Sequence, residues 1–148
     1  MKLIARSGLS LVLWMLLSVG AAAGTGLPIQ VSDAWIRWLP AGLPGAGYLT
    51  LTNTGSRACV LIGAQSADYA QVSFHESHSA GGMSSMTPVA SIAVKPRDSV
   101  RFAVGGLHLM LMQPARTLHP GDKVVVTLRF ADGRTLDVPF EVRTGGAE

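Results

Sequence analysis

The sequence predicts an all-β domain, and two observations support that class. Short runs that alternate apolar and polar residues recur between Gly-, Pro- and Asn-rich turns, and no window keeps a helical period. The clearest hairpin pairs residues 124–130 with 136–142 around the turn dipeptide Asp132-Gly133. Seven to nine short strands of this kind predict a β-sandwich or small barrel with Greek-key connections.

The other elements follow from the same alternation and turn signals. The strands expected before that hairpin are residues 29–39, 48–52, 57–64, 70–76, 91–94, 99–104 and 107–112. Residues 40–47 are rich in Pro and Gly and predict a loop, and the small polar residues 77–82 predict a turn or loop. Pro139 falls on the polar face of the last strand, which predicts an edge position for that strand.

Residues 1–23 have the pattern of a secretory signal peptide. Lys2 and Arg6 precede an apolar run over 9–19, and Ala21-Ala22-Ala23 offers a cleavage site. The run is too short for a membrane span, so we expect a periplasmic domain over residues 24–148 with no stable membrane insertion. An uncleaved anchor is the alternative. No cysteine follows the run directly, which argues against a lipid anchor.

Composition excludes several classes of function. Without Lys2 and Arg6, ten Lys and Arg residues face nine Asp and Glu residues and are scattered, so nothing indicates nucleic-acid binding. Cys59 is the only cysteine and lies in an apolar run, which predicts a buried thiol. A single cysteine disfavours a structural zinc or a blue-copper site, and the few dispersed carboxylates disfavour calcium. No Gly-x-Ser-x-Gly motif is present, and we expect no enzyme activity.

Residues 107–112 alternate leucine with histidine and methionine. In a strand, His108, Met110 and Met112 would share one face, because residues two apart point the same way. Imidazole and thioether ligands together suit Cu(I). The competing interpretation is structural, since methionine is also a common core residue.

Histidine and methionine gather in one window of the mature chain. All eight lie between residues 75 and 119, and they are His75, His78, Met83, Met86, His108, Met110, Met112 and His119. We expect His119 to be a surface residue, because it precedes a Pro-Gly turn. Met112 is left undecided between a ligand and a packing role.

The spacing within that window resembles the PCuAC family of periplasmic copper chaperones. Ten residues separate His75 from Met86, twenty-one separate Met86 from His108, and one separates His108 from Met110, which gives His-x10-Met-x21-His-x-Met. Flanking segments also resemble the family. These are Ala34-Trp35, residues 48–55, His75-Glu76, residues 108–112 and Gly121-Asp122-Lys123-Val124.

The resemblance implies a cupredoxin-like β-sandwich that binds one Cu(I) near its surface. By position, the ligands it implies are His75, Met86, His108 and Met110. It also implies delivery of copper to the cytochrome c oxidase subunit that carries the CuA centre, with a Sco-type thiol protein as a further partner.

The chain departs from the family at one position. Many members have a methionine two residues after the first histidine, where this chain has Ser77. His78 and Met83 lie in the same segment and are candidates to assist. Two other functions stay open, namely a copper buffer or resistance protein without an oxidase client and a metal-free β-sandwich interaction module.

Overall fold

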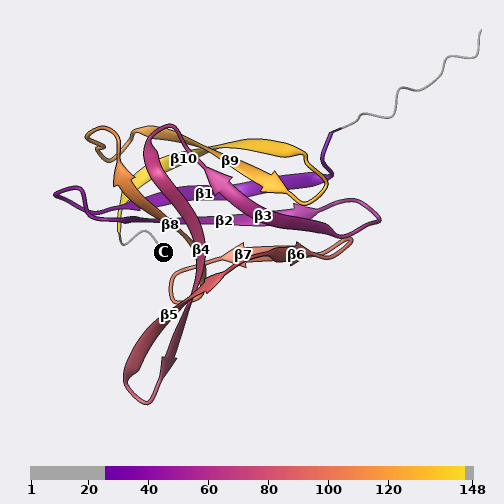
Figure 1. Ribbon diagram of the computed structural model, residues 1–148, viewed down its shortest axis with the longest axis horizontal. Coiled ribbons are helices and arrows are strands. Elements are labelled where there is room, and N and C mark those ends of the chain that lie inside the picture. Colours follow the sequence, from indigo (N-terminus) through magenta and orange to yellow (C-terminus); the bar gives the residue numbers. More distant parts are fainter. Residues whose placement is uncertain (1–25, 146–148) are drawn as a thin grey trace, which may run out of the picture.

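The computed structural model describes residues 26–145, and the expected signal peptide lies outside them. Its regular structure is all strand, which confirms the predicted class, but it has ten strands rather than seven to nine (Figure 1). They are β1 (Ile29–Trp38), β2 (Gly45–Asn53), β3 (Cys59–Gln65), β4 (Tyr69–Ala80), β5 (Met83–Val89), β6 (Ile92–Val94), β7 (Ser99–Phe102), β8 (Leu107–Pro114), β9 (Lys123–Phe130) and β10 (Thr135–Thr144). Within residues 26–145 we find no helix with the length and hydropathy needed to cross a membrane.

The strands form one sheet that curls around a single core. Its order is β5-β4-β8-β2-β1-β10-β9-β3-β6, and β7 pairs with β2 beside β8. Only β1 and β10 run parallel, while the other ladders are antiparallel. The connection from β3 to β4 therefore joins two strands that are far apart in the sheet order.

The core consists of alternate residues along the strands, those whose side chains point inward. On β8, Leu109 and Leu111 are fully buried, and on β9 Val124, Val126 and Leu128 are fully buried. Burial of each such side chain contributes about 1.5–3 kcal/mol relative to an exposed one. Cys59 also lies in this core, as predicted.

The predicted loop over residues 40–47 is too long, because β2 already begins at Gly45. A Cβ atom on Gly47 would lie 3.2 Å from Cβ of Leu109, closer than side chains normally pack. The glycine therefore lets β2 pair tightly with β8. A sequence of glycine and alanine signals a loop, but here it serves close strand approach.

The predicted edge position of the last strand is wrong. β10 lies between β1 and β9 in the sheet order. Its ladder to β1 begins only at Glu141, so Pro139 pairs with Val125 on β9 and has no β1 partner. Proline has no backbone N–H to donate. It is tolerated in this interior strand because β10 is not paired with β1 at position 139.

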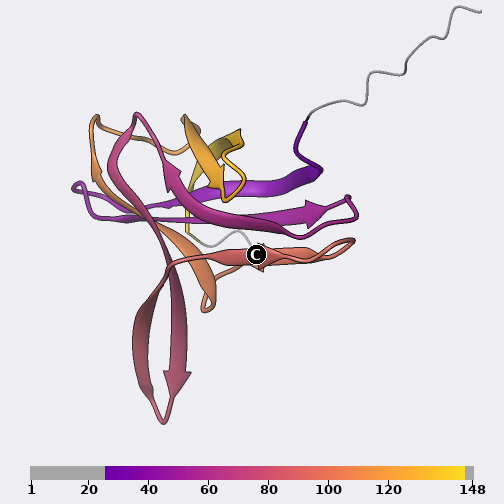
Figure 2. The ribbon, with the colours of Figure 1, turned by 45° about the vertical axis from the view of Figure 1, so that its right-hand side comes forward.

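The predicted turn or loop over residues 77–82 is also too long, because only Gly81 and Gly82 form a turn, and this difference shapes the candidate site. β4 continues to Ala80, and β5, which the sequence did not predict, returns antiparallel from Met83. Gly81 and Gly82 form the two-residue turn with φ of 59° and 76°, values that suit glycine. The resulting β4–β5 hairpin projects from the body of the domain (Figure 2).

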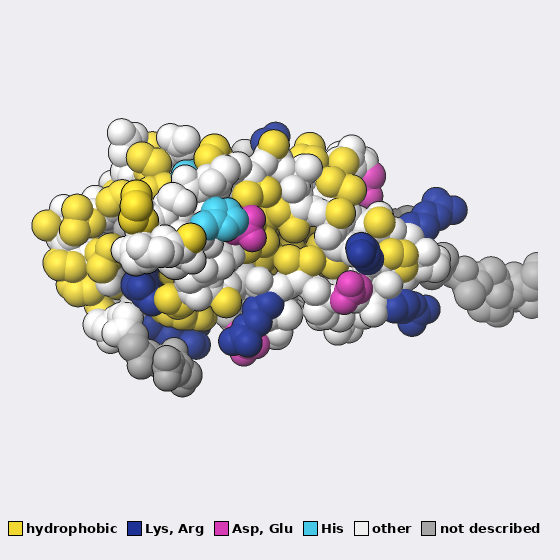
Figure 3. All heavy atoms as spheres, turned by 90° about the horizontal axis from the view of Figure 1, so that it is seen from below, with side chains coloured by type: hydrophobic (Ala, Val, Ile, Leu, Met, Phe, Trp, Pro, Cys, Tyr) yellow, Lys and Arg dark blue, Asp and Glu magenta, His cyan; other side chains and the backbone are white. Residues whose placement is uncertain are grey.

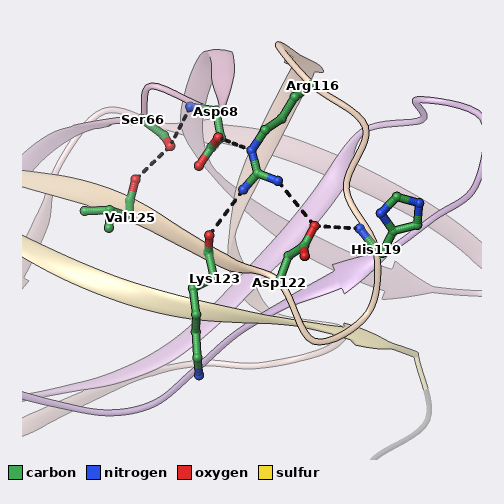
Figure 4. A network of polar contacts seen from close by, with 7 residues as sticks. All are labelled: Ser66, Asp68, Arg116, His119, Asp122, Lys123 and Val125. Carbon is green, nitrogen blue, oxygen red and sulfur yellow. Dashed lines mark hydrogen bonds and ion pairs between the residues drawn. The ribbon is translucent and has the colours of Figure 1, made fainter.

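The connection between β8 and β9 is fixed by one arginine. The Arg116 guanidinium donates to Asp68 at 2.6 Å, to Asp122 at 3.3 Å and to the Lys123 carbonyl at 3.3 Å (Figure 4). Asp122 also accepts from the backbone N–H of His119, and this bond together with Arg116 lowers the pKa of the Asp122 carboxyl. His119 itself is exposed, as predicted for a surface residue.

Candidate metal centre

The four predicted ligands lie on one face of three neighbouring strands. His75 of β4 is directly opposite His108 of β8, and Met110 is opposite Ser73, two residues before His75. On the other side of β4, Met86 of β5 is opposite Ser77, two residues after His75. Residues that face each other across a ladder, or lie two apart along a strand, point to the same side.

His108 is held with one ring nitrogen available. Its side chain is only 7% exposed, although it lies on the outer face of β8. Its Nδ1 donates to the Gly106 carbonyl oxygen at 3.0 Å. This bond selects the tautomer in which Nε2 keeps its lone pair, as is common for metal-binding histidines.

His75 has a buried ring nitrogen without a partner. Its Nε2 lies 3.3 Å from the Ser73 hydroxyl, while its Nδ1 is buried and makes no hydrogen bond among the described residues. An orphaned buried polar atom is unfavourable unless a ligand engages it. Burial, and secondarily the nearby His108, lower the pKa of His75 and thus favour the neutral form that binds metals.

The two thioethers differ in exposure. Met86 is 54% exposed on the projecting hairpin, whereas Met110 is partly buried between β4 and β2. Viewed from below, Figure 3 shows a histidine side chain at the surface directly beside an acidic side chain. One partly buried and one exposed thioether thus lie on the same face as two imidazoles, a donor set that suits Cu(I).

The other histidines and methionines of this window differ in the face of the sheet on which they lie. Met83 is opposite Ala80, and His78 is opposite Ser85, so both lie on the reverse face of the hairpin. There His78 lies 3.7 Å from Glu76. Met112 shares the face of Met110 and is opposite Gln71, one step further from His75. Among residues 26–145, no group of three or more His, Cys, Asp or Glu side chains is arranged to hold a metal ion.

Two supporting residues escaped the sequence analysis. Ser73 contacts the ring of His75, and its position two residues earlier on the same strand is the only signal for it. Gly106 binds His108 through its carbonyl group, and the same oxygen accepts from the N–H of Ser77 at 3.1 Å. A backbone contact of this kind leaves no trace in the sequence.

Comparison with known proteins assigns most of the chain to a family. The family model described as "Putative lipoprotein LpqE-like" matches residues 29–142. A protein of Leifsonia xyli subsp. xyli named "Putative lipoprotein Lxx21020" is 34% identical over 116 residues, which cover 78% of this chain and 69% of that protein. In the present chain the only cysteine, Cys59, is buried in β3.

Solved structures confirm the resemblance to PCuAC domains. The Cu(I) form of DR1885 from Deinococcus radiodurans is 31% identical, with a TM-score of 0.66 over 84% of each chain. The apo PCuAC domain of PmoF2 is 25% identical, with a TM-score of 0.66 over 81% of this chain and 93% of that one. A copper-bound PCuAC domain of PmoF2 shares the fold, with a TM-score of 0.66 and 24% identity. The match covers 79% of this chain and 93% of that chain.

Proposed function

The chain belongs to the LpqE-like family, and from this premise we propose that it is an extracytoplasmic Cu(I)-binding metallochaperone. The ligands in this proposal are His75, Met86, His108 and Met110. The observation that supports it best is their common face, where strands from three parts of the sequence bring two imidazoles and two thioethers together. The Cu(I) form of a 31% identical relative supports the choice of metal.

The proposed ligand set matches the charge and softness of Cu(I). Neutral imidazole and thioether groups bring no negative charge, so the bound ion keeps its single positive charge. Thioethers bind without losing a proton, and they do not form disulfides in an oxidising compartment. The lowered pKa of His75 keeps its imidazole in the ligand form.

Release would begin at Met86. This thioether lies on a projecting hairpin and is half exposed, so an incoming ligand from a partner can reach the metal on that side. His75 and His108, on neighbouring strands of the body, would hold the ion until enough partner ligands replace them. The acceptor we propose is the CuA-bearing subunit of cytochrome c oxidase in the periplasm, with a Sco-type thiol protein as co-worker.

A Cu(I) titration against a competing chelator tests the binding site. We expect one Cu(I) per mature protein, and we expect Met86→Ala with Met110→Ala to weaken binding by at least about 100-fold, or ~2.7 kcal/mol. Met83→Ala is the matched control, because Met83 is 78% exposed on the reverse face of the same hairpin. Unchanged affinity in the double variant would refute the ligand assignment.

Deletion of the gene distinguishes delivery from buffering. Loss of cytochrome c oxidase assembly at low copper would support delivery to CuA. Sensitivity to excess copper with intact oxidase would instead support a buffer without that client. Metal analysis of anaerobically purified protein separates both from a metal-free interaction module.

A further inference from the structure

A groove lies on the same sheet face as the candidate metal centre. Its volume is about 660 Å³, and residues of β1, β2, β7 and β10 line it, including Trp35, Tyr48 and Arg101. The ladders connect the two features directly, since Ala46 of β2 is opposite Met110 on one side and Arg37 on the other. Tyr48 lines the groove and lies two residues along β2 from Ala46, so the groove begins at a diagonal neighbour of Met110, about 7–8 Å away.

A β-bulge creates the aromatic floor of this groove. Between Ser32 and Trp35 the β1–β2 register shifts, and Asp33 adopts a φ of 54°. The extra residue turns Trp35 and Arg37 to the outer face and sends Ile36 into the core. Trp35 then packs on Tyr48 with ring centroids 4.7 Å apart.

Positive charge surrounds these rings. Arg37 lies over the Tyr48 ring at 5.8 Å, and its Nε is buried without a hydrogen-bond partner. Neither Arg37 nor Arg101 forms an ion pair with any Asp or Glu of the described residues. Arg143 is paired with Glu141 at 2.9 Å, and Asp33 is the one acidic residue that lines the groove.

One short loop connects the groove to the candidate metal centre. Ala103 and Val104 line the groove, and Val104 is 58% exposed at its rim. The N–H of Gly106 donates to the Ala103 carbonyl, and the Gly106 carbonyl in turn accepts from His108. A molecule in the groove would therefore touch the loop that orients a proposed copper ligand.

We propose that this groove docks an acidic surface segment of the protein that accepts copper. Arginine and aromatic residues are enriched in protein interfaces, and Arg37 and Arg101, which form no ion pair within residues 26–145, complement carboxylates. An acceptor bound in the groove would lie next to Met110. The metal ligands of the acceptor would then approach the copper from the side of the hairpin. This inference rests on the proposed copper-transfer function.

Peptide binding followed by NMR tests the inference. The probe is a synthetic peptide of alternating Glu and Gly, compared with a version in which Lys replaces Glu. We expect the Glu peptide to shift the indole N–H of Trp35 but not that of Trp38, whose indole N–H donates to the Leu118 carbonyl. Arg101→Glu should weaken the peptide about fivefold or more, and physiological salt should weaken it as well.

Arg57→Glu is the matched control. Arg57 is also exposed and undergoes the same change of charge, but it lies between β2 and β3 and does not line the groove. Equal losses in Arg57→Glu and Arg101→Glu, equal binding of the Lys peptide, or binding to phosphatidylglycerol vesicles but not to the Glu peptide would overturn the inference.

Copper titration of the same variants separates this inference from the proposed function. Arg101→Glu should bind Cu(I) as the parent protein does, since Arg101 is not among the proposed ligands. Normal Cu(I) binding without groove-specific peptide binding would refute the docking surface alone. Groove-specific peptide binding without Cu(I) binding would refute the proposed function and leave an acidic-segment site.

Discussion

His75 and His108 occupy directly opposite positions on β4 and β8, and their ring centroids are 6.1 Å apart. They are 33 residues apart in the sequence, and only the β4–β8 ladder brings them together. Burial is the main reason why the pKa of His75 is lowered, and repulsion between two charged imidazoles at this distance adds to it. The lowered pKa of His75 therefore favours the neutral, metal-binding form of this ring.

The first prediction concerns pH. Because the pKa of His75 is lowered from 6.5, the ring should stay neutral below the pH at which a free histidine protonates. The part of the Cu(I) affinity that depends on His75 should therefore hold as the pH falls to 6.5 and decline only at lower pH. NMR titration of the His75 ring, beside chelator competition across pH, measures both quantities.

The same shift affects the stability of the apo protein. The folded state binds a proton at His75 less readily than the unfolded chain does. The stabilisation that His75 contributes to the folded state is therefore fully present above pH 6.5. The contribution is lost as the pH falls through 6.5 towards the lowered pKa. Urea unfolding of the parent protein and of His75→Gln should show a smaller loss for the variant in this window. A measured His75 pKa at or above 6.5 would contradict the account.

A second prediction uses the position of Ser77. Ser77 is opposite Met86 and shares the face of His75. A methionine there would add a third thioether at the exposed side of the candidate centre, and we expect Ser77→Met to raise Cu(I) affinity about tenfold, or ~1.4 kcal/mol. Ser85→Met, opposite His78 on the reverse face, is the control and should leave the affinity unchanged.

A third prediction separates packing from metal binding on β8. Leu109→Ala removes a fully buried side chain and should lower the free energy of unfolding by about 2–5 kcal/mol. Met110→Ala, one residue away on the outer face, should cost less stability and lose more Cu(I) affinity. Chemical denaturation and copper competition on both variants test this division. If Met110→Ala destabilised the fold as strongly as Leu109→Ala, Met110 would be a core residue.

A fourth prediction concerns the hairpin turn. Gly82 has a φ of 76°, so Gly82→Val should strain the turn by about 1–2 kcal/mol and loosen β5. Hydrogen exchange of the β5 amides should then quicken while β9 stays protected, and Cu(I) affinity should fall because Met86 is held less well. Gly26→Ala is a suitable control, since Gly26 lacks a positive φ and a Cβ there meets nothing within 4 Å.

Much of the body of the fold could be predicted from alternation alone. The last hairpin, with seven cross-strand pairs in register, and the split of β8 into a leucine face and a histidine–methionine face both match the sequence analysis. These elements have one face in the core, so their apolar pattern is strong. The ligand set that the family resemblance implies stays a prediction, although the structure places all four residues on one face.

The projecting hairpin could not be predicted, because both of its strands lack a buried face near the tip. Residues 77–82 are small and polar, and most of β5 is exposed, so no hydrophobic period marks them as strands. The β4–β5 ladder and the Gly81-Gly82 turn stabilise them instead. The interior position of β10 could not be predicted either. Which strands pair with β10 on each side depends on the order of all strands in the sheet.

The identity of the atoms bound to copper tests the central claim most directly. Copper K-edge X-ray absorption on the Cu(I)-loaded protein should show two nitrogen and two sulfur donors. Met86→Ala with Met110→Ala should remove the sulfur contribution, whereas Met83→Ala should leave it unchanged. A copper site with only nitrogen and oxygen donors, or one whose sulfur donors survive the double substitution, would contradict the proposed centre.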